Sequence, residues 1–289
     1  MKWIATVLVL LAWPLWARAE EISLGDRSYV IDLPSRAANA PIILALHGGG
    51  GNPAQFARNS GLSRPANAKG YAVIYPAGTG LERAGRLAWN GGYCCGAAAR
   101  NGVDDVAFLD AVIADATKRF GLDGRRVYLT GMSNGSLMAE VYAAARPGRV
   151  RALGAVSGSM DVDRVRVKGP VPILVIHGTA DAHVPFAGGL GSEGKQATDW
   201  SSVDQVIAAF TAAFRGRLTR SETVLDPVRD DTRVLKTDYS DATGRVQIRL
   251  LAIEGGGHVW PGGRRAQRSG GTADIAANTE VLQFFALHP

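Results

Sequence analysis

The sequence predicts a doubly wound α/β fold, in which helices cover both faces of a mostly parallel β-sheet. Three observations predict it. Several short runs are almost continuously apolar, helical patterns with one apolar face lie between them, and Gly or Pro bounds most of the runs. Parallel strands covered on both faces have continuous rather than alternating apolarity. Alternation of such strands with helices is typical of a doubly wound sheet.

Six apolar runs are the expected strands: 42–46, 71–75, 127–130, 152–156, 173–176 and 250–253. The expected helices are 106–120, which ends at Gly121, 136–145, 203–214 and a last helix within 274–288. Ser202 and Gln205 have the spacing of a capping box, and Asp104 and Asp105 suit the N-terminus of a helix. Two Gly-rich segments, 76–102 and 187–200, are long enough to form the walls or lid of a pocket.

The first 19 residues have the pattern of a signal peptide. Lys2 precedes an apolar run over 3–16, and Ala17-Arg18-Ala19 is a small-residue cleavage pattern. The run is too short for a comfortable membrane span, so no stable membrane anchor is expected. We therefore expect an exported protein, periplasmic or secreted, with residues 20–289 as a single catalytic domain.

The charge pattern argues against nucleic acid as a partner. The formal net charge of the 289 residues is +6, but the basic residues are spread along the chain without interleaved aromatics. Nothing in the sequence indicates the oligomeric state.

A candidate nucleophile lies in the segment Thr130-Gly131-Met132-Ser133-Asn134-Gly135. An apolar run precedes it and a helical pattern follows, which is the context of a G-x-S-x-G nucleophile elbow. A Cβ at Gly131 or Gly135 would collide with the neighbouring backbone. The five-residue pattern alone is weak, because a glycine-rich strand-to-helix connection would also give it.

The candidate base is found among five histidines. His258 follows the last predicted strand, in Gly255-Gly256-Gly257-His258, where it could reach the elbow. His47 and His177 end strands, so we expect packing or hydrogen-bonding roles for them. His288 is expected to be exposed, and His183 is a weaker competitor in a loop.

The candidate acid is Asp181, which follows the strand at 173–176 and gives the chain order Ser, Asp, His. It would hold the His258 imidazole in one tautomer and stabilise the imidazolium. Asp161 and Asp163 also follow a strand and are its rivals.

An oxyanion hole is predicted at His47-Gly48-Gly49-Gly50-Gly51, which matches the HGGG-type loop. The expected donors are the backbone amides of Gly49 and Asn134. A phosphate-binding loop is the competing interpretation, but the segment lacks G-x-G-x-x-G spacing and a Gly-Lys-Ser/Thr end.

With these pieces, the chain resembles the α/β-hydrolase esterases described as polyhydroxybutyrate depolymerase-like, which include feruloyl and acetylxylan esterases. The resemblance extends from about residue 24 to the last helix. It rests further on Trp89-Asn90, Cys94-Cys95-Gly96, Gly102 to Phe108, His177-Gly178-Thr179, Val184-Pro185 and His258 to Gly262. It implies hydrolysis of carboxylic esters by a Ser-Asp-His triad without a cofactor. Polymer-degrading members often carry an added substrate-binding domain, so small or soluble esters are the expected substrates here.

Trp260 and Trp89 are the candidate substrate-binding residues. Trp260 stands two residues after His258, where its ring could line the pocket, and a packing role has equal weight because tryptophan is usually buried. Trp89 has weaker support.

Cys94 and Cys95 are the only cysteines, and adjacency allows them one intrachain pairing. In an oxidising compartment they are candidates for a disulfide, and two reduced, buried thiols are the alternative. No further cysteine or suitably spaced histidine pair supports a metal site.

The sequence therefore predicts acyl transfer from an ester through an acyl-enzyme. Two alternatives stay open: a serine peptidase of the same fold, and a non-catalytic binding protein built on this scaffold.

Overall fold

The computed structural model describes residues 20–81, 86–193, 198–266 and 270–289. The predicted signal peptide, residues 1–19, lies outside the described residues.

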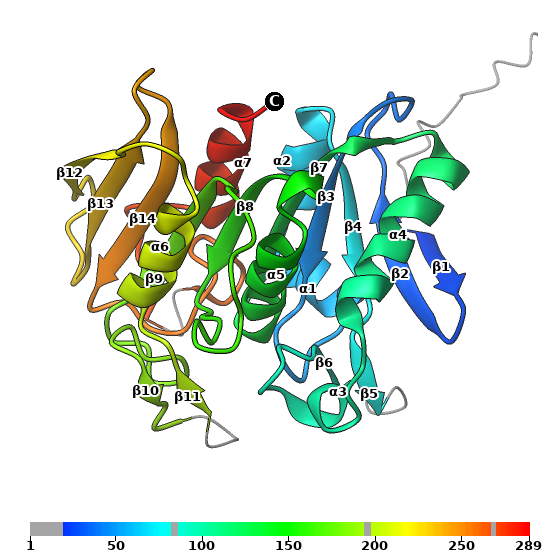
Figure 1. Ribbon diagram of the computed structural model, residues 1–289, viewed down its shortest axis with the longest axis horizontal. Helices are drawn as coiled ribbons and strands as arrows, with labels where there is room; N and C mark the ends of the chain where they lie inside the picture. Colours follow the sequence, from blue (N-terminus) through cyan, green and yellow to red (C-terminus); the bar gives the residue numbers. More distant parts are fainter. Residues whose placement is uncertain (1–19, 82–85, 194–197, 267–269) are drawn as a thin grey trace, which may run out of the picture.

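A ten-stranded sheet crosses the molecule (Figure 1). Its strands lie side by side in the order β1-β2-β4-β3-β7-β8-β9-β14-β13-β12. In chain order these are β1 (Glu20–Leu24), β2 (Arg27–Asp32), β3 (Pro41–Leu46), β4 (Ala72–Pro76), β7 (Asp123–Met132), β8 (Val150–Val156), β9 (Ile173–Gly178), β12 (Thr219–Leu225), β13 (Arg233–Ser240) and β14 (Val246–Glu254).

The centre of the sheet confirms the six predicted strands. β4, β3, β7, β8, β9 and β14 are neighbours in that order, and each adjacent pair is parallel. All five residues of β4 and all six of β9 are buried. The continuous apolar runs therefore reflect burial on both faces of the sheet.

The antiparallel strands at the two edges of the sheet were not predicted. β1 and β2 pair antiparallel at one edge, and β12, β13 and β14 pair antiparallel at the other. β2 buries only alternate residues, and six of the seven residues of β12 are exposed. Such strands lack the continuous apolarity on which the prediction depended.

Helices cover both faces of the sheet, as predicted (Figure 1). α4, α5 and α6 pack on one face, and α1, α2 and α7 pack on the other, each group around its own apolar core. Their bounds are α1 (Pro53–Ser60), α2 (Ser63–Ala68), α4 (Asp105–Phe120), α5 (Asn134–Ala145), α6 (Val203–Ala212) and α7 (Ala277–Ala286). None of the described helices is long and apolar enough to cross a bilayer.

The predicted capping residues of two helices are confirmed. The Asp104 side chain caps α4 by accepting from the amide of Ala107 at 2.9 Å, and Gly121 ends that helix in the left-handed region. Ser202 and Gln205 form both hydrogen bonds of a capping box at the start of α6.

The two Gly-rich segments lie beyond the carboxyl ends of the parallel strands, at the lower edge in Figure 1. The first contains β5 (Thr79–Leu81), β6 (Arg86–Ala88) and α3 (Gly96–Arg100), and the second contains β10 (Gly189–Leu190) and β11 (Asp199–Trp200). The rings of Tyr93 and Trp200 meet edge to face, with centroids 5.9 Å apart. The two segments therefore touch each other.

Candidate active site

Ser133 lies at the sharp turn between β7 and α5, in a strained backbone conformation. Its φ is 58° and its ψ is −125°, which a residue with a Cβ rarely adopts. The Ser133 amide donates to the carbonyl of Val156 at 2.9 Å. A Cβ on Gly131 would lie 2.5 Å from the carbonyl carbon of Gly135, and one on Gly135 would overlap the carbonyl oxygen of Leu46. The predicted need for glycine at both positions is confirmed.

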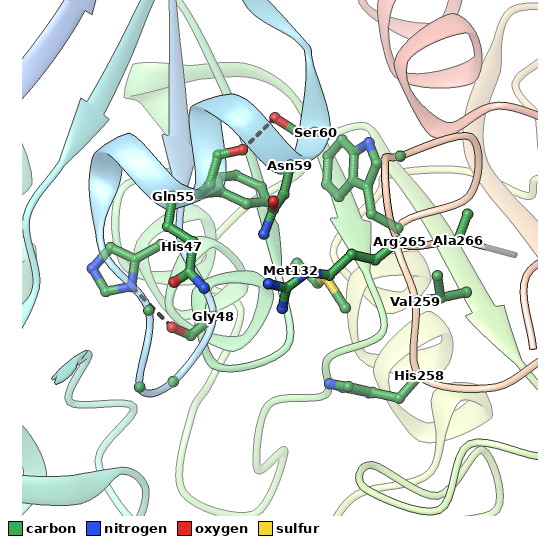
Figure 2. Close-up of a pocket in the computed structure, with 16 residues that line it drawn as sticks. His47, Gly48, Gln55, Asn59, Ser60, Met132, His258, Val259, Arg265 and Ala266 are labelled. Atoms are coloured by element: carbon green, nitrogen blue, oxygen red, sulfur yellow. Dashed lines mark hydrogen bonds between the residues drawn. The ribbon is translucent and has the colours of Figure 1, made fainter. Parts of the chain in front are cut away.

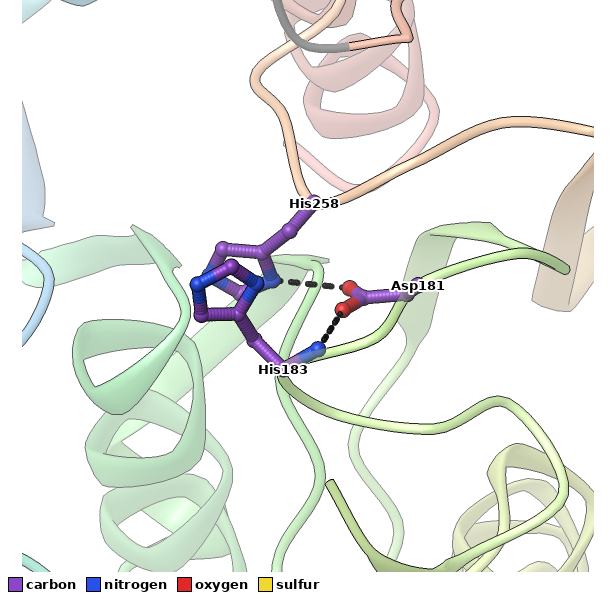
Figure 3. Close-up of side chains that lie close together, drawn as sticks. All are labelled: Asp181, His183 and His258. Carbon is purple, nitrogen blue, oxygen red and sulfur yellow. Dashed lines mark hydrogen bonds and ion pairs between the residues drawn. The ribbon is translucent and has the colours of Figure 1, made fainter. Parts of the chain in front are cut away.

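Asp181 and His258 meet from the loops after β9 and β14. The Nδ1 atom of His258 lies 2.7 Å from Oδ2 of Asp181 (Figure 3). The other carboxylate oxygen, Oδ1, accepts the amides of His183 and Val184 at 2.9 Å each. Both oxygens of this buried carboxylate are therefore engaged, and the imidazole is fixed through Nδ1.

The electrostatics keep Asp181 ionised. Burial raises the pKa of this carboxyl, but its hydrogen bond with His258, the charge of His258 and the Val184 amide oppose that effect, and the net pKa is lowered. An ionised acid here can stabilise an imidazolium on His258.

Asp161, one rival for the acid, has the same local geometry with a different partner. Its Oδ1 accepts the amides of Asp163 and Arg164, and its Oδ2 pairs with the guanidinium of Arg164. Asp163, the other rival, is exposed. Neither contacts His258.

His183, the competitor for the base, lies against His258 instead of replacing it. The two imidazoles stack with centroids 4.7 Å apart, as Figure 3 shows. Asp181, His183 and His258 each offer one ligand atom, and these atoms lie within 4.8 Å of one another. A cation held by the three would compete with the hydrogen bond between Asp181 and His258.

His47 and His177 have the predicted hydrogen-bonding roles at strand ends. His47 accepts the amide of Gly78 through Nε2 at 3.0 Å and donates through Nδ1 to the carbonyl of Gly48 at 2.9 Å. Burial lowers the pKa of His47 to about 4, so this ring is neutral. His177 is also buried, which lowers its pKa, and its Nε2 lies 2.8 Å from the carbonyl of Val184.

The expectation that His288 is exposed is wrong. Only 6% of the residue is accessible, and its ring lies 5.0 Å from that of Phe284. The chain end packs against β7, where the Tyr128 hydroxyl donates to the carbonyl of His288.

The two predicted oxyanion donors lie next to each other. A Cβ built on Gly49 would stand 3.4 Å from Cβ of Asn134, and one on Gly48 would stand 3.5 Å from Cβ of Ser133. Within the described chain, the amides of Gly49 and Asn134 make no hydrogen bond to another residue. Both N–H groups are therefore free to face an incoming oxygen.

Trp89 is hydrogen-bonded to both segments that carry the predicted oxyanion donors. Its side chain is fully buried, and its indole N–H donates to the carbonyl of His47 at 2.9 Å. Its backbone amide and carbonyl bond the Asn134 side chain at 2.7 and 3.0 Å. Trp89, predicted to bind substrate, thus has no exposed surface to offer, and it ties the glycine loop to the first residue of α5. Sequence spacing gave no signal of this contact.

A cavity of about 300 Å³ opens beside His258 (Figure 2). Its lining comes from the glycine loop, α1, Met132 and the segment after His258, and includes Gln55, Asn59, Trp260 and Arg265. Trp260 is therefore at the predicted pocket, although it is only 5% exposed and packs edge to face on Phe56. The described residues of the Gly-rich segments 76–102 and 187–200 do not line this cavity. Part of the second segment, Ala187 to Gly189 with Asp199 and Trp200, lines a different cavity.

Ser133 itself does not line this cavity, and its hydroxyl makes no hydrogen bond to another described residue. The cavity reaches its immediate neighbour Met132 and the imidazole of His258. Contacts between a nucleophile and its base are often long in an empty site and shorten when substrate binds.

The two cysteines lie next to Trp89. Their Sγ atoms are within bonding distance of each other, and the amide of Cys95 donates to the carbonyl of Trp89 at 2.9 Å. The pair is thus attached to the residue that supports the glycine loop.

Comparison with known proteins finds similarity to esterases. Residues 27–163 match the family model described as Esterase PHB depolymerase. The matched segment includes the glycine loop and Ser133 but ends before Asp181 and His258. NocK of Nocardia uniformis subsp. tsuyamanensis, named as an esterase without a stated substrate, is 29% identical over 80% of this chain and 68% of its own. Feruloyl esterase B of Piromyces equi is 26% identical over 81% of this chain, but over only 42% of its own length.

Among solved structures, an acetyl xylan esterase from Aspergillus awamori superposes with a TM-score of 0.61. The superposition covers 93% of this chain and 98% of that chain at 15% sequence identity, which shows a common fold. The chain thus has the α/β-hydrolase fold. Over residues 27–163 it is similar to the esterase family of PHB depolymerases, and feruloyl and acetylxylan esterases are among the proteins that its sequence resembles.

Proposed function

We propose that the protein is an exported serine esterase that hydrolyses carboxylic esters through Ser133, Asp181 and His258. One observation carries the proposal. A buried carboxylate holds Nδ1 of His258 at 2.7 Å, at the same sheet edge where Ser133 occupies a strained strand-to-helix turn. Esterase relatives support the reaction class, and feruloyl, acetyl and short hydroxyalkanoate esters are the candidate substrates.

In this mechanism, Nε2 of His258 takes the proton of the Ser133 hydroxyl as the oxygen attacks the ester carbonyl. The amides of Gly49 and Asn134 stabilise the oxyanion. His258 then gives the proton to the leaving alcohol, and the acyl-enzyme forms. Water, activated by the same imidazole, releases the acid and restores the serine.

A substrate panel tests this function. It contains 4-nitrophenyl acetate and butyrate, methyl ferulate, a hydroxybutyrate oligomer and an aminoacyl anilide, each with the wild type and Ser133→Ala. We expect ester turnover that Ser133→Ala abolishes. Absence of turnover of every ester by the wild type would refute the esterase proposal, and preference for the anilide would favour a peptidase.

Export and the disulfide belong to the same proposal. The sequence of residues 1–19 supports export. The proximity of the two Sγ atoms supports a disulfide between Cys94 and Cys95. Intact mass of the purified exported protein checks both: we expect a chain that starts at Glu20 and takes up no alkylating label when unfolded without reductant. Uptake of two labels would disprove the disulfide.

A further inference from the structure

The cavity beside His258 carries a positive charge that the proposed mechanism does not use. Arg265 is exposed and lines this cavity, and Figure 2 shows its side chain reaching from its loop into the pocket, toward the side that carries Gln55 and Asn59. The guanidinium makes no salt bridge or hydrogen bond with any other residue in the part of the chain that the structure describes. Its donors are therefore available to a ligand.

The rest of the lining does not neutralise this charge. None of the described residues around the cavity is an aspartate or a glutamate. Asp181, behind His258, already uses both of its oxygens on protein donors. A negative group that entered the pocket would therefore meet a cation and polar amides but no opposing carboxylate.

The side chains opposite Arg265 add neutral donors. The Gln55 and Asn59 amides stand one turn apart on α1, facing the same cavity. A planar guanidinium pairs with a carboxylate through two parallel hydrogen bonds, and a side-chain amide can donate to a remaining lone pair. The lining also includes apolar side chains, which suit a short carbon chain: Phe56, Met132, Val259 and Trp260.

We infer that this pocket is a carboxylate subsite, and that the preferred substrates are esters that carry a free carboxylate on the half of the molecule that enters it. Arg265 is the specificity-determining residue, with Gln55 and Asn59 as its partners. The inference rests on the proposed esterase function and goes beyond it, because the triad alone does not distinguish an anionic ester from a neutral one.

The test uses pairs of esters in which one member carries a free carboxylate and the other does not. In the first pair, 4-nitrophenyl hemisuccinate carries the carboxylate on its acyl side, and 4-nitrophenyl butyrate is the neutral ester. In the second pair, 4-acetoxybenzoate carries the carboxylate on its alcohol side, and phenyl acetate is the neutral ester. In at least one pair, we expect Arg265→Gln to lower kcat/KM for the anionic ester by about 5- to 10-fold, between the effect of an exposed ion pair and that of a charged hydrogen bond. The neutral ester should change by less than about 2-fold, and Arg265→Lys should keep part of the preference.

Arg264→Gln is the matched control. Arg264 is the adjacent exposed arginine and does not line the cavity, so the variant removes the same charge from the same loop. It should leave the preference unchanged. The wild-type preference should also fall as salt rises from about 0.02 to 0.5 M, since salt screens an exposed charge.

Equal losses on anionic and neutral esters would overturn the carboxylate subsite and would indicate a site for a neutral polar group. No difference between Arg265→Gln and Arg264→Gln in either pair would also overturn it. If the wild type hydrolyses no ester, the proposed esterase function fails. The carboxylate subsite is then tested separately, by calorimetric measurement of the affinity of Ser133→Ala for monoethyl succinate and for diethyl succinate. Tighter binding of the monoester that depends on Arg265 would support it, and equal binding would refute it.

Discussion

At the residue scale, the roles of the two oxygens of Asp181 predict what an amide would do in its place. The amides of His183 and Val184 both donate to Oδ1, so an asparagine must place its oxygen there. Its NH₂ group would then face Nδ1 of His258 and force the proton onto Nε2, the atom that must accept the serine proton. We expect Asp181→Asn to lower kcat by about 10³–10⁴, measured with 4-nitrophenyl acetate.

Asp161→Asn is the control for that substitution. Asp161 also accepts two backbone amides through Oδ1, but its other oxygen pairs with Arg164 and not with a histidine. Its kcat should stay within about 3-fold of the wild-type value, as expected where no transition-state contact is lost. A loss below 10-fold for Asp181→Asn in a protein that unfolds like the wild type would contradict the assignment of the acid.

At the element scale, the turn between β7 and α5 leaves no room for a side chain at its second glycine. A Cβ on Gly135 would overlap the carbonyl oxygens of Leu46 and His47, which are backbone atoms of β3 and its loop. Backbone of a central strand cannot move aside cheaply, so Gly135→Ala should destabilise the fold by at least about 3 kcal/mol. Urea unfolding followed by circular dichroism measures the change.

Gly148→Ala is the comparison for this element. Gly148 has open space where its Cβ would stand and has no left-handed φ. The free energy of unfolding should therefore change by less than about 0.5 kcal/mol. Similar stability of the two alanine variants would mean that the turn is not packed as described.

The helix after the elbow carries a buried acid that makes stability depend on pH. Glu140 of α5 is fully buried, and its Oε2 accepts the amide of Met160 at 2.7 Å. Burial raises the pKa of Glu140 to about 8, well above its ordinary value of 4.5. The folded state thus binds a proton that the unfolded state has released, and the free energy of unfolding should fall as pH rises from about 4.5 to 8.

Glu140→Gln should remove this dependence, because glutamine keeps the acceptor for Met160 and does not ionise. Urea unfolding of both proteins at pH 5 and pH 8 measures the difference. We expect the wild type to lose more stability than the variant between these pH values. Parallel losses would show that Glu140 is not the group responsible.

The elements that the sequence predicted are those whose signal is local. Continuous apolarity identified the six parallel strands, and the capping box at Ser202 and the glycine stop at Gly121 identified helix ends. Strand β12 escaped prediction because its exposed residues make it a strand only through pairing with β13. The same distinction between local and distant signals applies in the site. Chain order and the ends of strands indicated Asp181 and His258. The hydrogen bond between Trp89 and Asn134 was not predicted, because it joins residues 45 positions apart in the sequence.

At the scale of the whole molecule, the candidate site is assembled from both halves of the chain. Residues up to 156 build the strands from β1 to β8, which carry the glycine loop and Ser133. Residues from 173 onward build β9, β14, β13 and β12, which carry Asp181 and His258. The two halves meet where β8 pairs with β9, and α7 crosses this junction, with Val281 packed over Gly154. The sheet and the site therefore depend on the same junction, the seam where β8 pairs with β9.

The match to the family model ends at residue 163. A chain that stops there should neither fold nor hydrolyse esters. Without β9, the edge of β8 exposes unpaired backbone groups, and Leu153 and Ala155 lose the β9 residues with which they pair. We expect residues 20–163 to be insoluble, or soluble without a cooperative thermal transition, and inactive toward 4-nitrophenyl acetate. Residues 20–289, prepared in the same way, are the control. Cooperative unfolding of the shorter chain would show that the first half is a folding unit by itself, and that the seam between β8 and β9 matters for the site alone.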